Sequence, residues 1–121
     1  MPYTIRENSG LMRIAMTGPL AAVDLHAMLT EVDTMVRDRP VWPDNLFDMR
    51  GMEVAALGFV EVMSLARRRE AVTPPNAIRM AFVAEAPSLV GYVRMFQNLN
   101  QNPQITSRIF STVESAEAWL L

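Results

Sequence analysis

The segment IRMAFVA, residues 78–84, is apolar at every position except Arg79. Successive side chains of a strand point to opposite sides of its sheet, so an almost unbroken apolar run is typical of a strand that is covered on both faces. We therefore interpret this segment as a central strand. Sheets that contain such strands are mostly parallel and carry helices as crossovers.

Patterns on the N-terminal side of this run predict strands and helices in turn. Two β-prone runs, 3–7 and 11–17, flank the turn sequence Asn8-Ser9-Gly10 and predict an antiparallel hairpin. Apolar residues at helical spacing then predict a helix that ends near Arg37, with Leu25, Met28, Leu29, Val32 and Val36 on its apolar face. After Pro40 and Pro43, we expect a short strand at 45–48 and a helix from about 57 to 70.

On the C-terminal side, Pro87 or Ser88 opens a helix that runs to about residue 100, and a strand is expected at 104–110. Ser111 and Glu114 have the spacing of a capping box and predict a last short helix that ends near Leu120. This order predicts an α/β fold, with a mostly parallel sheet of about five strands, an N-terminal antiparallel hairpin and about four helices.

Length and composition narrow the class of protein. A chain of 121 residues, half of them hydrophobic, fits a single domain over 1–121. The net charge of −2 disfavours nucleic acid as a partner. The chain has no cysteine, which is typical of a reducing compartment, and residues 1–20 resemble neither a signal peptide nor a membrane span. We therefore expect a cytoplasmic protein.

Four stretches carry a resemblance to a known family: NLFDMRG at the end of the strand near 48, IRMAFVA, GYVRMFQ, and the ending RIFSTVESAEAWLL. Together with the order of elements, they resemble the SpoIIAA-like branch of the STAS superfamily, which is related in fold to Sec14-type lipid-binding domains. The resemblance covers nearly the whole chain. It implies a SpoIIAA-like fold, and it describes a fold more than an activity.

Regulatory members of this superfamily, the anti-sigma-factor antagonists, carry a serine at the start of the helix after the strand that corresponds to the one ending near Asp48, and a partner kinase phosphorylates it. The equivalent stretch here is AALGF, residues 55–59. From Asp48 through Met63 the chain has no serine, threonine or tyrosine, so it offers no hydroxyl group as a phosphate acceptor. The sequence therefore predicts no phosphorylation site there.

The second and third predicted helices carry more apolar residues than one buried face requires. A ligand cleft between these helices is therefore one interpretation. We expect a non-catalytic, bacterial-type regulatory or binding module for a small apolar or lipid-like ligand. Arg50 would contact its polar head, and the predicted lining comprises Met52, Phe59, Met63, Tyr92, Met95 and Phe96.

Other interpretations fit the same apolar surplus. Loops and the neighbouring helix can cover it, or it can form a homodimer or a regulator-binding face. With the cations of Arg67, Arg68 and Arg69, it can also make a weak peripheral contact with the inner membrane. A role at the end of a helix, where cations offset the helix dipole, is by itself sufficient to explain those arginines. Asp48 and Gly51 suit a turn in which Asp48 accepts backbone N–H groups and Gly51 adopts an unusual conformation.

Catalytic chemistry has little support in the sequence. His26 is the only histidine, so a histidine metal cluster or a histidine-dependent triad has no second member, and we expect His26 to be a solvated helix residue. No nucleotide-binding or zinc-binding motif occurs. We therefore expect no enzyme activity, no cofactor and no metal.

Overall fold

The computed structural model of the chain describes residues 2–53 and 58–121. Within them the strands are β1 (Tyr3–Asn8), β2 (Leu11–Pro19), β3 (Asp44–Glu53), β4 (Ile78–Val83) and β5 (Ile105–Phe110). The helices are α1 (Ala22–Val36), α2 (Phe59–Glu70), α3 (Pro87–Leu99) and α4 (Val113–Leu120). The strands form one sheet in the order β1-β2-β3-β4-β5, in which only the β1–β2 pair is antiparallel. The predicted α/β fold is confirmed.

The hairpin between β1 and β2 forms where the turn sequence predicts it. Asn8 pairs with Leu11, so Ser9 and Gly10 alone make the turn. Both have positive φ angles, 52° and 74°, which is the backbone conformation that two-residue hairpin turns require. This conformation is easy for glycine and uncommon for serine.

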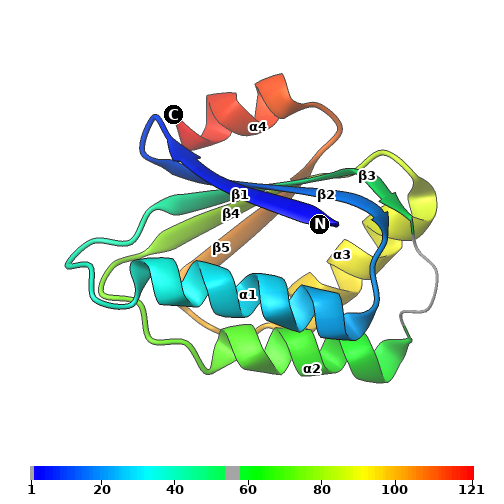
Figure 1. Ribbon diagram of the computed structural model, residues 1–121, viewed down its shortest axis with the longest axis horizontal. Coiled ribbons are helices and arrows are strands. Elements are labelled where there is room, and N and C mark those ends of the chain that lie inside the picture. Colours follow the sequence, from blue (N-terminus) through cyan, green and yellow to red (C-terminus); the bar gives the residue numbers. More distant parts are fainter. Residues whose placement is uncertain (1, 54–57) are drawn as a thin grey trace.

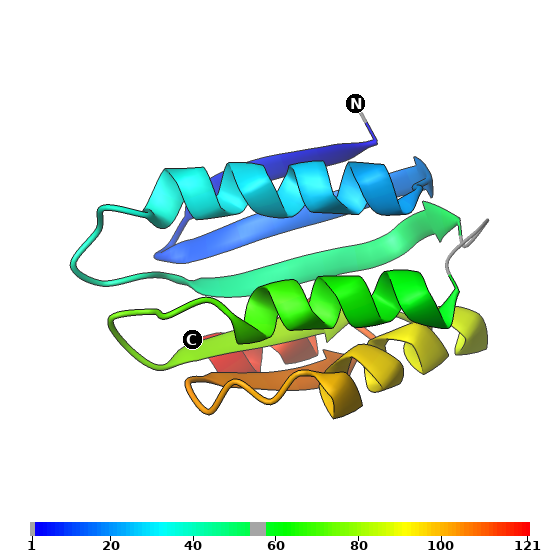
Figure 2. The ribbon, with the colours of Figure 1, turned by 90° about the horizontal axis from the view of Figure 1, so that it is seen from below.

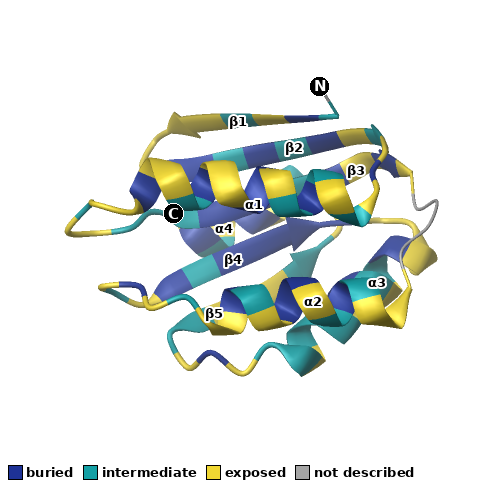
Figure 3. Ribbon diagram, turned by 60° about the horizontal axis from the view of Figure 1, so that its bottom comes forward, coloured by how far each residue is buried: buried dark blue, intermediate teal, exposed yellow. Residues whose placement is uncertain are grey.

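Helices cover the two faces of the sheet unequally. Figures 1 and 2 show α1, α2 and α3 on one face and α4 on the other. The larger apolar core lies under α1, α2 and α3, and a smaller one lies under α4, which packs on β3, β4 and β5. Figure 3 shows buried residues along β2, β3 and β4, whereas β1 at the edge is largely exposed.

Strand β4 contributes to both cores, which accounts for its apolar run. Met80 and Phe82 belong to the larger core, and Ala81 and Val83 to the smaller one. Its one charged residue, Arg79, lies on the side of α4. The Arg79 Nη1 and Nη2 groups donate to the last carbonyls of α4, those of Trp119 and Leu120, at 2.6 and 2.8 Å. The prediction of an interior strand covered on both faces is confirmed.

Strand β3 is longer than the predicted 45–48, because it continues to pair with β2 as far as Glu53. Ala15 pairs with Asp48 but Thr17 pairs with Gly51, so β3 carries an extra residue at this point, a β-bulge. Polar side chains hid this part of the strand from the sequence analysis.

The expectation that Gly51 adopts an unusual backbone conformation is wrong. Among the described glycines, positive φ angles occur at Gly10 and Gly18. A Cβ atom on Gly51 would instead lie 3.1 Å from Thr17 Cγ2 and 3.2 Å from the Met16 carbonyl oxygen. Glycine therefore allows β2 to approach the bulge closely.

One predicted helix start differs from the structure, and another lies outside the described residues. Thr112, and not Ser111, caps α4, since its side chain accepts a hydrogen bond from the Ser115 N–H at 3.2 Å. Helix α2 begins at Phe59, after Gly58 as its cap, and the Gly58 N–H donates to Glu61 Oε2 at 3.0 Å. The predicted start near 57, and residues 55–57 of AALGF, lie outside the described residues.

Candidate functional site

An apolar cavity of about 90 Å³ lies between the sheet and helices α1, α2 and α3. All three helices and the three central strands contribute to its wall. The lining residues are Met16, Leu25, Met28, Leu29, Phe47, Met49, Met52, Val62, Leu65, Arg69, Met80, Phe82, Leu89, Tyr92, Val93 and Phe96.

The β-bulge in β3 helps to build this wall. Phe47 and Met49 are two residues apart, so their side chains point to the same face of the sheet. It is the face that α1, α2 and α3 cover. The next residue on that face would be 51 in a regular strand, but the extra residue moves the alternation by one, and Met52 takes the position. Because of the bulge, the side chain of Met52 lies in the cavity wall at the position that Gly51 would take in a regular strand.

Methionine is common in this wall. Five of the chain's ten methionines line the cavity: Met16, Met28, Met49, Met52 and Met80. The unbranched thioether side chain has several rotatable bonds and fills irregular apolar space. A wall rich in methionine can therefore adapt its shape to a ligand more readily than a wall of branched side chains.

Among the described residues that line the cavity, Arg69 alone carries a charge. Only 4% of Arg69 is exposed. Its Nη1 group donates to Asp33 Oδ1 of α1 at 3.0 Å, whereas its Nε and Nη2 groups are buried without a hydrogen-bond partner in the described part of the chain. Burial lowers the pKa of Arg69 and the Asp33 carboxylate opposes that effect, yet an arginine guanidinium keeps its proton in proteins. A charged group with free donors therefore borders an apolar cavity.

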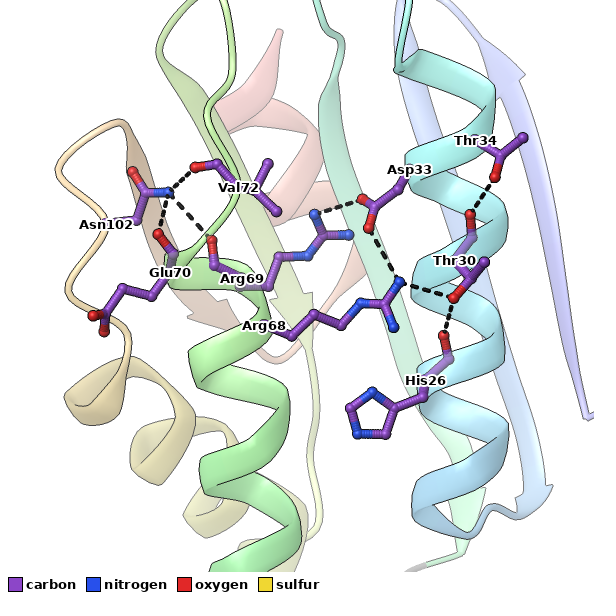
Figure 4. A network of polar contacts seen from close by, with 9 residues as sticks. All are labelled: His26, Thr30, Asp33, Thr34, Arg68, Arg69, Glu70, Val72 and Asn102. Atoms are coloured by element: carbon purple, nitrogen blue, oxygen red, sulfur yellow. Dashed lines mark hydrogen bonds and ion pairs between the residues drawn. The ribbon is translucent and has the colours of Figure 1, made fainter.

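Asp33 forms ion pairs with two arginines. Figure 4 shows Arg68 and Arg69 reaching from α2 toward Asp33 on α1. Arg68 Nη2 lies 3.3 Å from Asp33 Oδ2 and also donates to Thr30 Oγ1 at 2.8 Å. One carboxylate therefore pairs with two guanidinium groups at this point, and it ties α1 to α2 beside the cavity.

Asn102 holds the end of α2 in place. Its Nδ2 group lies 3.2, 3.3 and 2.7 Å from the carbonyl oxygens of Arg69, Glu70 and Val72 (Figure 4). The carbonyls of Arg69 and Glu70 belong to the last turn of α2, whose acceptors have no partner within the helix. The Arg69 carbonyl also accepts from the Val72 N–H at 3.2 Å, just beyond the helix. The position of Arg69 is thus fixed through its backbone as well as through Asp33.

The predicted site residues are only partly brought together. Met52, Tyr92 and Phe96 line the cavity, whereas Met63 and Met95 are half-buried elsewhere and Phe59 is 56% exposed. Neither of the two α2 residues predicted to line the cleft, Phe59 and Met63, lies in the cavity wall. The buried residues of that helix are Val62, Leu65, Ala66 and Arg69.

Arg50, the predicted contact for a polar head, lies outside the cavity wall and pairs with Asp48. Arg50 Nε and Nη2 donate to the two carboxylate oxygens of Asp48, each at 2.9 Å. These bonds lower the pKa of Asp48. The expected role of Asp48 as an acceptor for backbone N–H groups is confirmed, since the Arg50 N–H donates to it at 3.2 Å, but this occurs within β3 and not in a turn.

Sequence reasoning missed Arg69 and Asp33. Arg67, Arg68 and Arg69 lie in the last turn of α2, as the helix-end interpretation predicts. The alternative, in which all three meet lipid, does not fit Arg69, which is buried. The sequence does contain a pattern that indicates burial of Arg69. Val62, Leu65, Ala66 and Arg69 have the i, i+3, i+4, i+7 spacing of one helix face. This pattern did not lead to a prediction of burial, because arginine is seldom fully buried unless it is paired. The partner of Arg69, Asp33, lies on another helix.

His26 is half-buried on the side of α1 that faces α2, and its Nε2 atom lies 3.3 Å from Ser64 Oγ. It is thus a contact between helices and less solvated than expected. Within residues 2–53 and 58–121, no group of three or more histidine and acidic side chains is arranged to hold a metal ion. No helix in the same residues is long and apolar enough to cross a membrane.

Solved structures of other proteins are similar to this chain in fold. The chain is similar to an uncharacterized protein of the DUF3478 family from Shewanella loihica PV-4, whose structure is described as having a SpoIIAA-like fold. The TM-score is 0.65 at 13% identity, and the match covers 98% of this chain and 92% of that one. The fold is SpoIIAA-like.

A second solved structure with this fold is an anti-sigma factor antagonist from Mycobacterium paratuberculosis. Its TM-score is 0.63 at 17% identity, with 98% of this chain and 92% of that chain covered. Neither a protein-family model nor a curated protein matches the sequence. At these identities the likeness concerns the SpoIIAA-like fold, and function has to be argued from the residues of this chain.

Proposed function

We propose that this chain is a non-catalytic binding module that holds a small apolar or amphiphilic molecule between the sheet and helices α1, α2 and α3. The observation that carries the proposal is the apolar cavity of about 90 Å³, walled by five methionines and ten other uncharged side chains besides Arg69. Well-packed cores of small domains leave few spaces larger than a water molecule. A space of this size in so small a domain favours a ligand.

The volume sets the size of the ligand. An engineered protein cavity of about 150 Å³ binds benzene, and pockets for drug-sized molecules reach about 300 Å³ or more. The present cavity is smaller than either, so it fits a few carbon atoms as it stands. A chain of about six carbons fits once methionine side chains turn aside.

A titration with straight-chain alcohols of four to eight carbons tests this proposal. Each buried methylene contributes about 0.8 kcal/mol, so affinity should rise with length and then level off when the cavity is full. In NMR spectra, the methyl signals of the five lining methionines should shift, whereas that of Met35, which is exposed on α1, should not.

A matched pair of variants sharpens the test. Val62→Leu adds a methylene group to the cavity wall, and Val60→Leu makes the same change at a site that is 67% exposed on the same helix. We expect the first to weaken alcohol binding about tenfold and the second to leave it unchanged. No binding by the unmodified protein, or equal effects of the two variants, would contradict the proposal.

A second candidate function is binding of a protein partner. Phe59 and Val60, at the start of α2, are 56% and 67% exposed, and adjacent large apolar residues on a surface favour an interface. One neighbour in fold is named as an anti-sigma factor antagonist, a name that describes action through other proteins. The partner can also be a second copy of this chain.

The double variant Phe59→Glu, Val60→Glu tests this candidate. Sedimentation over a range of concentrations should show self-association that the variant abolishes if the partner is a second copy. Cosedimentation with liposomes of the inner-membrane type tests the remaining alternative, a peripheral membrane contact. A monomer at every concentration would contradict the homodimer.

A further inference from the structure

We propose that Arg69 binds the carboxylate of an amphiphilic ligand whose apolar chain fills the cavity. This inference rests on the proposed function and names the chemical class of its ligand. It is carried by the cavity together with a buried arginine in its wall that has two nitrogens without a hydrogen-bond partner in the described residues.

The two nitrogens form one recognition edge. In a guanidinium group, the N–H bonds of Nε and Nη2 point in the same direction and match the two oxygens of a carboxylate. Arg50 in the same chain shows this geometry, since its Nε and Nη2 donate to Asp48 Oδ1 and Oδ2, each at 2.9 Å. In Arg69 the same edge has no partner within residues 2–53 and 58–121, and the remaining Nη1 bonds to Asp33.

The charges around Arg69 favour an anion with a single negative charge. Arg68 and Arg69 share Asp33 as their partner, so two positive charges and one negative charge leave a net charge of +1. A monovalent carboxylate completes the balance in a place where solvent screens poorly. A divalent phosphate would leave an excess negative charge in an apolar wall, which makes it the weaker candidate.

Side chains of the cavity wall that can change rotamer give a ligand access to Arg69. Arg69 Nε and Nη2 are shielded from solvent, so a ligand has to displace neighbouring side chains to reach them. Methionines make up five of the sixteen lining residues, and Tyr92 and Phe96 of α3 are only half-buried. Rotation of such side chains costs less than movement of the backbone.

Hexanoate and hexan-1-ol, which share a six-carbon chain, test the inference in isothermal titration calorimetry. Charge-assisted hydrogen bonds should make hexanoate bind about ten- to a hundredfold more tightly than the alcohol. The variant Arg69→Met should bind both molecules with the affinity of the alcohol. The control Arg67→Met, which removes the same charge from an exposed site on α2, should keep the preference. Hexyl phosphate, as a third probe, should bind more weakly than hexanoate.

A second readout does not depend on the folding of a variant. The Arg69 Nε–H signal in the NMR spectrum of the unmodified protein should shift when hexanoate is added and stay in place with hexan-1-ol. Equal affinity for both molecules, or an unmoved Arg69 signal, would overturn the inference and leave the apolar ligand standing. Failure of both molecules to bind would overturn the proposed function and the inference together.

Discussion

Arg50 and Arg69 each lie beside one aspartate, yet the two pairs differ in burial and in completeness. The Arg50 side chain is 45% exposed, and Asp48 takes up its recognition edge. Arg69 is buried, it shares Asp33 with Arg68, and its recognition edge has no partner among the described residues. The exposed pair is complete by itself, whereas the buried one is completed, in our proposal, by a further anion.

The two arginines differ in the free energy that an unpaired donor would cost. In water an unpaired arginine is solvated at little cost, so the Asp48–Arg50 pair contributes little to stability. In an apolar wall, each unpaired donor costs about 1–3 kcal/mol of folding free energy. A chain that keeps a buried arginine in this condition gives up stability, and a ligand that restores the missing bonds regains it.

The largest effect is expected from Asp33→Ala, which leaves Arg69 buried with no carboxylate. Removal of one partner from a buried ion pair costs about 3–5 kcal/mol, and urea unfolding measures the loss. Asp38→Ala, at an exposed carboxylate just beyond α1, serves as the control and should change little. A loss below about 1 kcal/mol for Asp33→Ala would mean that Arg69 is not held as a buried charge.

The pH dependence of ligand preference comes next in size. Carboxylic acids of this kind lose their charge below a pKa of about 4.3. The tenfold or larger preference for hexanoate should therefore be full at pH 7 and should fall about tenfold with each pH unit below about 4. Affinity for hexan-1-ol, measured in the same buffers, should stay constant and shows that the protein remains folded. A preference that persists at low pH would exclude a charged contact.

A smaller effect on stability is expected for Arg69→Met. Asp33 keeps Arg68 as its partner, and methionine fills a similar volume without buried donors. The free energy of unfolding should stay within about 1 kcal/mol of the unmodified protein or increase. A loss of about 3 kcal/mol or more would show that the guanidinium serves the fold, and it would remove the contrast with Arg50.

The smallest effect is expected at the exposed pair. Arg50 lowers the pKa of Asp48 from its ordinary value of 3.8 in the folded protein. The contribution of Asp48 to stability is therefore present above pH 3.8 and is lost as the pH falls through the lower, folded value. In Arg50→Met the Asp48 carboxyl should titrate at a higher pH in NMR spectra, while unfolding at pH 7 changes far less than in Asp33→Ala. An unchanged Asp48 titration would contradict the pairing.

The fold was accessible from sequence because local and global signals agree. The turn Ser9-Gly10, the apolar run of β4 and the spacing of apolar residues in α1 each favour the element that forms. The β-bulge in β3 was not accessible, since Asp48, Arg50 and Gly51 interrupt the apolar pattern on which the prediction depended. The bulge decides that Met52 lines the cavity, so the wall could be predicted only in part.

The buried arginine was missed for a different reason. Its burial depends on Asp33, which lies 36 residues earlier and on another helix. The helical spacing of Val62, Leu65 and Arg69 was visible, but charge outweighed spacing in the interpretation. The sequence analysis also indicated an apolar ligand with a charged contact, for which it named Arg50, whereas our proposal names Arg69.

A crystal structure of the protein with bound hexanoate compares the two arginines most directly. Our account predicts the alkyl chain in the cavity and the carboxylate oxygens about 2.7–2.9 Å from Arg69 Nε and Nη2, with the Asp48–Arg50 pair unchanged. A carboxylate on Arg50 or elsewhere on the surface, with the cavity unfilled, would contradict it.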